Sequence, residues 1–129
     1  MIVVDSAVVV DVLTAVEGGE DLRAELAGED LHAPELLDFE VVSALRGQTL
    51  RRRITPARAL DALTDFDALP ILRWPSAAPL RLRAFALRDN LSAYDAAYVV
   101  LAEALQCAVV TRDAQLARSC GHNVEIRLR

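Results

Sequence analysis

The sequence predicts an α/β protein in which helices cover a central parallel sheet of four to five strands. Short β-rich segments alternate with longer helical ones, which is the pattern of parallel strands joined by helical connections. The hydrophobic fraction of 53% is too high for a disordered chain. A length of 129 residues, without repeats or a linker, suits one domain, so we expect residues 1–129 to form a single domain.

The individual elements follow from apolar patterning and from start and stop signals. Strands are expected at 2–4, 31–33, 70–74 and 107–111, with a fifth at 124–126; helices are expected at about 7–15, 20–27, 35–50, 55–66, 76–90, 93–105 and 114–119. The expected N-caps are Ser6, Thr55, Ser76 and Ser92, and Pro34 is expected to open the third helix.

Three further expectations concern packing. The helices at 35–50 and 55–66 are expected to form a hairpin that stands out from the sheet. Phe39, Phe66 and Phe85 are assigned to the core. The apolar stripe of the 7–15 helix exceeds what the core needs, which makes it a candidate surface for a dimer or a partner helix.

Composition excludes several functions. All fourteen basic residues are arginine, so the chain lacks the lysine that a Walker A loop requires. The same absence excludes the lysine-dependent phosphate sites of receiver domains and haloacid-dehalogenase-like phosphatases. No GxGxxG fingerprint and no apolar run of membrane-spanning length occur. The N-terminus lacks the features of a signal peptide, and Cys107 and Cys120 have no metal-site or CxxC spacing. We therefore expect a cytoplasmic protein with unpaired cysteines.

Two carboxylates follow the two strongest strands. Asp5 directly follows Ile2–Val4, and Asp113 comes two residues after Thr111. In open α/β sheets, ligands bind beyond the carboxyl ends of the strands, so both acids are expected at the same edge of the sheet. The alternative for each is a turn or a helix cap.

Two further carboxylates lie on inward-facing helix positions. Glu40 has Leu36, Leu37 and Ala44 among its neighbours one turn away, which places it beside an apolar stripe, whereas Asp38 faces solvent. The alternative for Glu40 is a boundary residue paired with an arginine. Asp95 is the third helical residue after Ser92, so a capping box explains it equally well.

Four clustered acids would repel one another unless a cation or protons neutralise them. Mg²⁺ or Mn²⁺ meets this need, since Mg²⁺ prefers oxygen ligands and takes only one or two carboxylates directly. We expect Asp5 and Asp95 as direct ligands, Asp113 as a ligand through water or of a second ion, and Glu40 as the group that orients water or acts as base. Ser6 and Thr111 are candidates to hold these ligands in place, or are simply strand-end and helix hydroxyls.

At these residues the sequence resembles the PIN-domain family, and most closely its VapC-type toxins. The matching segments, in family order, are Ile2-Val3-Val4-Asp5-Ser6, Ala33–Val41, Leu91–Tyr98 and Val110-Thr111-Arg112-Asp113. They extend over essentially the whole chain, and every acidic position of the family pattern is present. The resemblance implies a three-layer α/β/α sandwich, a Mg²⁺- or Mn²⁺-dependent endoribonuclease, a homodimer, and a cognate VapB-like antitoxin as partner, with larger assemblies such as a heterotetramer.

Charge is distributed unevenly along the chain. Residues 1–40 hold eleven acids and one base, and residues 41–129 hold eight acids and thirteen bases. Among these bases Arg46, Arg51, Arg52, Arg53 and Arg58 are candidates to bind RNA phosphates or the antitoxin, and the alternative is a solvated hairpin tip. Two other functions stay open: a non-catalytic RNA- or protein-binding module, and a nuclease acting on structured DNA.

Overall fold

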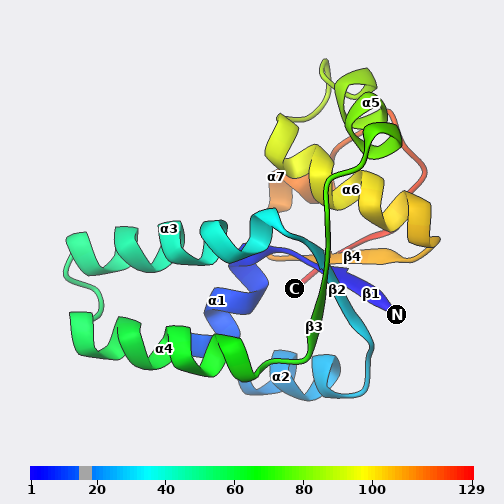
Figure 1. Ribbon diagram of the computed structural model, residues 1–129. Coiled ribbons are helices and arrows are strands. Elements are labelled where there is room, and N and C mark those ends of the chain that lie inside the picture. Colours follow the sequence, from blue (N-terminus) through cyan, green and yellow to red (C-terminus); the bar gives the residue numbers. More distant parts are fainter. Residues whose placement is uncertain (15–18) are drawn as a thin grey trace.

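Five parallel strands form one sheet at the centre of the molecule (Figure 1). The computed structural model describes residues 1–14 and 19–129. The strands are β1 (Ile2–Val4), β2 (Leu31–Pro34), β3 (Ile71–Trp74), β4 (Ala108–Thr111) and β5 (Ile126–Leu128), in the order β3-β2-β1-β4-β5. The register is fixed around β1, where Ile2 lies opposite both Leu31 and Ala108. The predicted parallel sheet is confirmed, with its last strand two residues later than expected.

Helices cover both faces of the sheet, which confirms the three-layer sandwich (Figure 1). On one face lie α1 (Ser6–Thr14), α2 (Gly19–Ala27), α3 (Leu36–Leu50) and α4 (Pro56–Ala68). On the other lie α5 (Ala78–Ala86), α6 (Ala93–Leu105) and α7 (Ala114–Ala117). The expected end of the first helix at residue 15 is outside the described residues.

The strand order places a topological switch point between β1 and β4. From β1 the chain moves to β2 and β3 on one side, then returns through α5 and α6 and adds β4 and β5 on the other side. Ligands of open α/β sheets bind outside the carboxyl ends of strands at such a point. Asp5 follows β1, and Asp113 follows β4 by two residues, so the two acids flank it.

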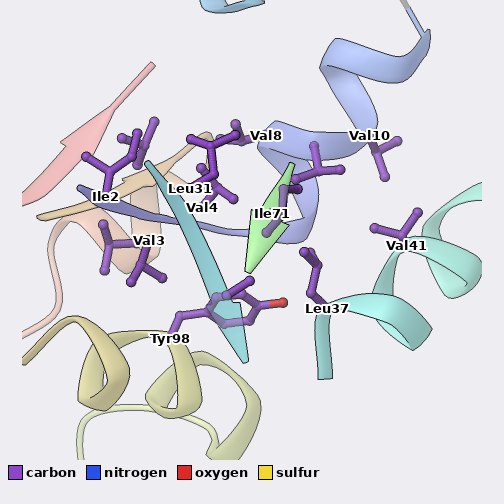
Figure 2. Close-up of a cluster of buried hydrophobic side chains, with 14 of the residues drawn as sticks. Ile2, Val3, Val4, Val8, Val10, Leu31, Leu37, Val41, Ile71 and Tyr98 are labelled. Atoms are coloured by element: carbon purple, nitrogen blue, oxygen red, sulfur yellow. The ribbon is translucent and has the colours of Figure 1, made fainter. Parts of the chain in front are cut away.

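The core lies on both faces of β1, β2 and β4 and is built from aliphatic side chains with one tyrosine (Figure 2). Val8, Val9, Val12 and Leu13 of α1 are all buried, because α2, α3 and α4 pack around that helix. The expected free apolar stripe on this helix was therefore wrong. Phe66 is in the core as expected, whereas Phe39 and Phe85 are 78% and 67% exposed, so their assignment to the core was wrong as well.

Local capping differs from expectation at three helices. Asp5, rather than Ser6, caps α1, since its Oδ1 accepts a hydrogen bond from the backbone N–H of Val8 at 3.0 Å. Pro34 ends β2 instead of opening α3, and Ala77 occupies the N-cap of α5. Ser76 instead accepts a hydrogen bond from Arg81. Thr55 and Ser92 cap α4 and α6 as expected.

The α3 and α4 helices form the expected hairpin, which extends away from the sheet (Figure 1). Its tip is a tight turn in which the N–H groups of Arg51, Arg52 and Arg53 bond to carbonyls of the last turn of α3. Arg52 has a positive φ of 58°, a backbone conformation that is uncommon for residues other than glycine. Among the described helices, none is long and apolar enough to cross a bilayer.

Candidate functional site

Thr111 joins the two acids at the switch point. Its hydroxyl donates to Oδ2 of Asp5 and accepts a hydrogen bond from the backbone N–H of Asp113 at 2.9 Å. Asp5 is 7% exposed and Thr111 is fully buried. The end of β1 and the residues after β4 are therefore fixed relative to each other through one buried hydroxyl. The role expected for Thr111, which is to hold metal ligands in place, stays a prediction. Ser6, the other expected position-holding residue, is half-buried in the first turn of α1.

Asp113 and Asp95 also take part in helix capping, which was the alternative explanation for each of them. Oδ1 of Asp113 accepts hydrogen bonds from the N–H groups of Gln115 and Leu116 and so caps α7. The Ser92 hydroxyl accepts from the N–H of Asp95 at 3.1 Å, which caps α6. These caps fix the backbone at both acids. Asp113 is exposed and Asp95 is half-buried, so neither carboxylate is sealed in the core.

Glu40 is bonded to a tyrosine that crosses from the opposite layer of the sandwich. The hydroxyl of Tyr98, on α6, donates to Oε1 of Glu40, on α3, at 2.6 Å. Tyr98 is 2% exposed, and Figure 2 shows its ring within the core with the hydroxyl pointing toward Leu37 and α3. Glu40 is thus a boundary carboxylate, but its partner is a neutral hydroxyl rather than the arginine that its alternative requires.

The four carboxylates lie close enough to influence one another. The pKa of Asp5 is raised to about 6, chiefly by burial; hydrogen bonds from Thr111 and Val8 lower it, and the charges of Asp113 and Glu40 contribute to the rise. Burial also raises the pKa of Asp95, with Asp113 adding to the effect and Ser92 opposing it. Like-charged neighbours therefore surround a partly desolvated acidic edge of the sheet.

Within residues 1–14 and 19–129, no arginine forms an ion pair with any of these four acids, although the chain has fourteen arginines. Among the described residues, the arginine ion pairs are those of Arg73 with Asp38, Arg83 with Glu103, Arg112 with Asp11, Arg127 with Glu125 and Arg129 with Glu25. The acids that receive an arginine all lie outside the four. A cluster of carboxylate oxygens without a basic partner has the donor chemistry that Mg²⁺ and Mn²⁺ prefer.

The carboxylates surround a common region without converging on one point. Across residues 1–14 and 19–129, no three His, Cys, Asp or Glu side chains are arranged to chelate a single ion. A Mg²⁺ ion keeps several waters and takes one or two carboxylates directly, so it does not require such a trio. The residues present therefore fit a hydrated divalent ion.

The arginines singled out from the sequence separate into two groups. Arg46, Arg51, Arg52 and Arg53 are exposed on the outer part of the hairpin. Arg58 is committed instead to the fold, since its guanidinium donates to the carbonyl of Leu13 at the end of α1 at 2.8 Å. One guanidinium nitrogen of Arg58 is therefore used within the fold, and its binding to phosphate or to the antitoxin stays a prediction.

Tyr98 is the functional candidate that the sequence reasoning missed. In the sequence it appeared only as the last residue of the Leu91–Tyr98 segment, with no role of its own. The available signal was its place three residues after Asp95, because a buried tyrosine hydroxyl on the inward face of the helix must find a hydrogen-bond partner. The identity of that partner depends on a contact over 58 residues of sequence.

A parallel sheet with four acids around its switch point defines an α/β protein with an acidic site of the kind that suits a divalent cation. The PIN domain family model matches residues 2–121, and the chain belongs to this family. It is 39% identical to Ribonuclease VapC12 of Mycobacterium tuberculosis over 99% of this chain and 98% of that protein. It is 43% identical to VapC ribonuclease Mb0985 of Mycobacterium bovis over 90% of this chain and 88% of that protein.

Solved structures support the same fold. The crystal structure of Mycobacterium tuberculosis VapC20, described as a Sarcin-Ricin loop cleaving toxin, superimposes with a TM-score of 0.69 over 98% of this chain and 99% of that one. PAE2754 from Pyrobaculum aerophilum superimposes with a TM-score of 0.66 over 90% of this chain and 83% of that one. Sequence identities of 14% and 22% make these likenesses of fold alone.

Proposed function

We propose that residues 1–129 form a single cytoplasmic endoribonuclease domain that acts as the toxin of a VapBC-type pair and depends on Mg²⁺ or Mn²⁺. The observation that carries this proposal is the set of four acids at the switch point, left without arginine partners in the described part of a chain rich in arginine. The high identity to VapC ribonucleases over nearly the full chain supports RNA as the substrate.

The acids divide the work according to their environment. Asp5 and Asp95 would hold the ion directly, and Asp113 would contribute through water or to a second ion. A bound divalent ion lowers the pKa of a coordinated water and neutralises charge on the scissile phosphate. Glu40 would orient the attacking water and accept its proton. Thr111 keeps Asp5 in place, and the caps on α6 and α7 fix the backbone at Asp95 and Asp113.

Cleavage assays with purified protein test this proposal. Single-stranded RNA should be cut in the presence of Mg²⁺ or Mn²⁺ and not in the presence of EDTA, and Asp5→Asn or Asp95→Asn should abolish cutting. Equal residual cleavage by wild type and both variants would reveal a contaminant and remove the assignment. Parallel assays on RNA and on branched or flapped DNA separate this proposal from a structure-specific DNA nuclease.

The exposed arginines of the hairpin are proposed to bind RNA phosphates or the antitoxin. Arg51 is eleven residues from Glu40 along α3, which corresponds to about 16 Å and is within reach of a strand that crosses the site. Replacing Arg51, Arg52 and Arg53 with Gln should weaken RNA binding and lower its salt dependence by about one unit per lost phosphate contact. Arg129→Gln is the matched control, because that guanidinium is paired with Glu25.

A second copy of the chain is the proposed occupant of the apolar surface formed by β3 and α5. Leu72, Leu82 and Phe85 are 56%, 72% and 67% exposed there, and β3 is an edge strand. Between α5 and α6 lies a cavity of about 760 Å³ lined mainly by apolar groups. Several exposed apolar side chains on one surface are more typical of a protein–protein interface than single scattered ones. Leu82→Glu with Phe85→Glu should give a monomer by light scattering, whereas Leu60→Glu, on exposed α4, should not.

A further inference from the structure

We propose that Tyr98 is a positioning residue for cleavage, because it holds Glu40 in the orientation that the reaction needs. This inference rests on the proposed ribonuclease function and deepens it. It concerns a contact between α6 and α3, which belong to different faces of the sheet.

The geometry of the contact carries the inference. The phenol oxygen of Tyr98 lies 2.6 Å from Oε1 of Glu40, which is the short distance of a charge-assisted hydrogen bond. Oε1 is thereby occupied, and Oε2 is the oxygen of Glu40 left for a water or substrate at the acidic edge. A glutamate side chain has three rotatable bonds, so one fixed donor removes much of its freedom.

The ring of Tyr98 is itself enclosed by core side chains. It is 2% exposed, and Figure 2 shows it among the buried side chains of the core. Burial raises the pKa of Tyr98, and the bond to Glu40 raises it further, so the hydroxyl keeps its proton and remains a donor. A rigid ring with a permanent donor is suited to orient a carboxylate, since sites of this kind need supporting groups that are locked by packing.

The same device occurs at Asp5. There the buried hydroxyl of Thr111 donates to one carboxylate oxygen, as Tyr98 does to Glu40. Both donors are neutral. A neutral hydroxyl fixes a carboxylate without cancelling its charge, which keeps the acidic edge attractive to a cation, whereas an arginine in either place would compete with that cation.

Tyr98→Phe tests the inference because it removes one oxygen atom and keeps the ring. The turnover number on RNA should fall about 10- to 100-fold, which is the range for residues that hold a catalytic group in place by a hydrogen bond. KM should change less than about twofold. Tyr94→Phe is the matched control, since Tyr94 is one turn earlier on α6 and 64% exposed. It should retain wild-type turnover.

A double variant separates positioning from general stabilisation. If Tyr98 acts through Glu40, then Tyr98→Phe should cause no further loss of turnover in a Glu40→Gln background. A purely structural tyrosine would lower the melting temperature and leave the turnover of folded protein unchanged, or its effect would multiply with that of Glu40→Gln. Either result would overturn the inference.

Two further outcomes are distinguishable. If wild type does not cleave RNA, the proposed function fails and the inference fails with it; if wild type cleaves RNA and Tyr98→Phe retains its full turnover, the inference alone is refuted. If Tyr98→Phe does not fold, the variant Glu40→Asp is measured in its place. The shorter aspartate side chain keeps the negative charge but no longer reaches the hydroxyl of Tyr98. Full turnover of that variant would also refute the inference.

Discussion

Asp38 and Glu40 are two residues apart on α3, yet they belong to two different regions of the molecule. Asp38 points outward, its side chain is 52% exposed, and it pairs with the guanidinium of Arg73 at 3.0 Å. Glu40 points toward the sheet and accepts a hydrogen bond from the neutral hydroxyl of Tyr98. Asp38 is thus neutralised by an arginine, as are four other acids away from the site, whereas Asp5, Glu40 and Asp113 accept hydrogen bonds from hydroxyl or backbone N–H groups.

This difference shows how the carboxylates of an acidic site can keep their charge available in an arginine-rich chain. Carboxylates at the surface gain little from an arginine but lose nothing by it. Carboxylates at the switch point need donors that orient them and leave their charge available, and the described structure provides those from Thr111, Tyr98 and the first turns of α1 and α7.

The largest expected effect tests whether Glu40 and Asp38 differ in function. Glu40→Gln should lower the turnover of RNA cleavage about 100-fold or more, because it removes the proposed proton acceptor. Asp38→Asn should change turnover less than about twofold. Single-turnover cleavage at saturating Mg²⁺ measures both. Equal losses in the two variants would show that the two acids do not differ in function.

The next effect concerns stability and pH. Asp5 has a pKa of about 6 in the folded protein against 3.8 as its ordinary value, so its contribution to stability is fully present below pH 3.8 and is lost as the pH rises through 6. The shift corresponds to about 3 kcal/mol as an order of magnitude. In EDTA, Asp5→Asn should therefore gain stability relative to wild type above pH 6, since Asn can still cap α1.

Urea unfolding at pH 4 to 8 measures this gain. The difference between Asp5→Asn and wild type should grow between pH 4 and pH 7 and shrink again when Mn²⁺ is added to wild type. A difference that does not depend on pH would mean that Asp5 is not desolvated in the folded protein.

A smaller effect is expected from the hydroxyl that joins Asp5 to Asp113. Thr111→Val should destabilise the protein by about 1–3 kcal/mol, because it leaves a buried carboxylate oxygen and a backbone N–H without their partner. Thr64→Val is the control, since that exposed hydroxyl bonds only to the carbonyl one turn earlier on α4, and its cost should stay within about 0.5 kcal/mol. Thermal unfolding of both variants distinguishes the two sites.

The smallest effect is expected on the outer surface. Arg129→Gln breaks the pair with Glu25 and should cost less than about 1 kcal/mol, with the cost shrinking further in 1 M salt. Urea unfolding at low and high salt checks this. A loss as large as that of Thr111→Val would mean that the outer ion pairs support the fold as much as the site hydroxyls do.

Local signals were sufficient for most of the framework. An apolar run followed by an acid predicted the ends of β1 and β4, and parallel strands bring such ends to one edge whatever the rest of the chain does. The caps at Thr55 and Ser92 were also predictable, because a cap depends on residues three positions apart. The cap of α1 was misplaced by one residue, since Asp5 and Ser6 are both good caps and only backbone geometry chooses between them.

Burial was predicted less well, because it depends on which neighbours cover a face. Phe39 and Phe85 are apolar yet exposed, because they lie on sides of α3 and α5 that the other described elements leave largely uncovered. The valines of α1 are buried because three other helices surround them, and periodicity along a single helix cannot reveal that number.

The sequence by itself determined the α/β class, the edge at which the acids lie and the absence of a lysine-dependent phosphate site, because these depend on short-range pattern and composition. Only the tertiary structure decided that Tyr98 reaches Glu40 across the sandwich, that Thr111 joins Asp5 to Asp113, and that Arg58 stays with α1. Each of these contacts joins residues far apart in the chain or on different elements, and their partners are chosen by packing rather than by spacing.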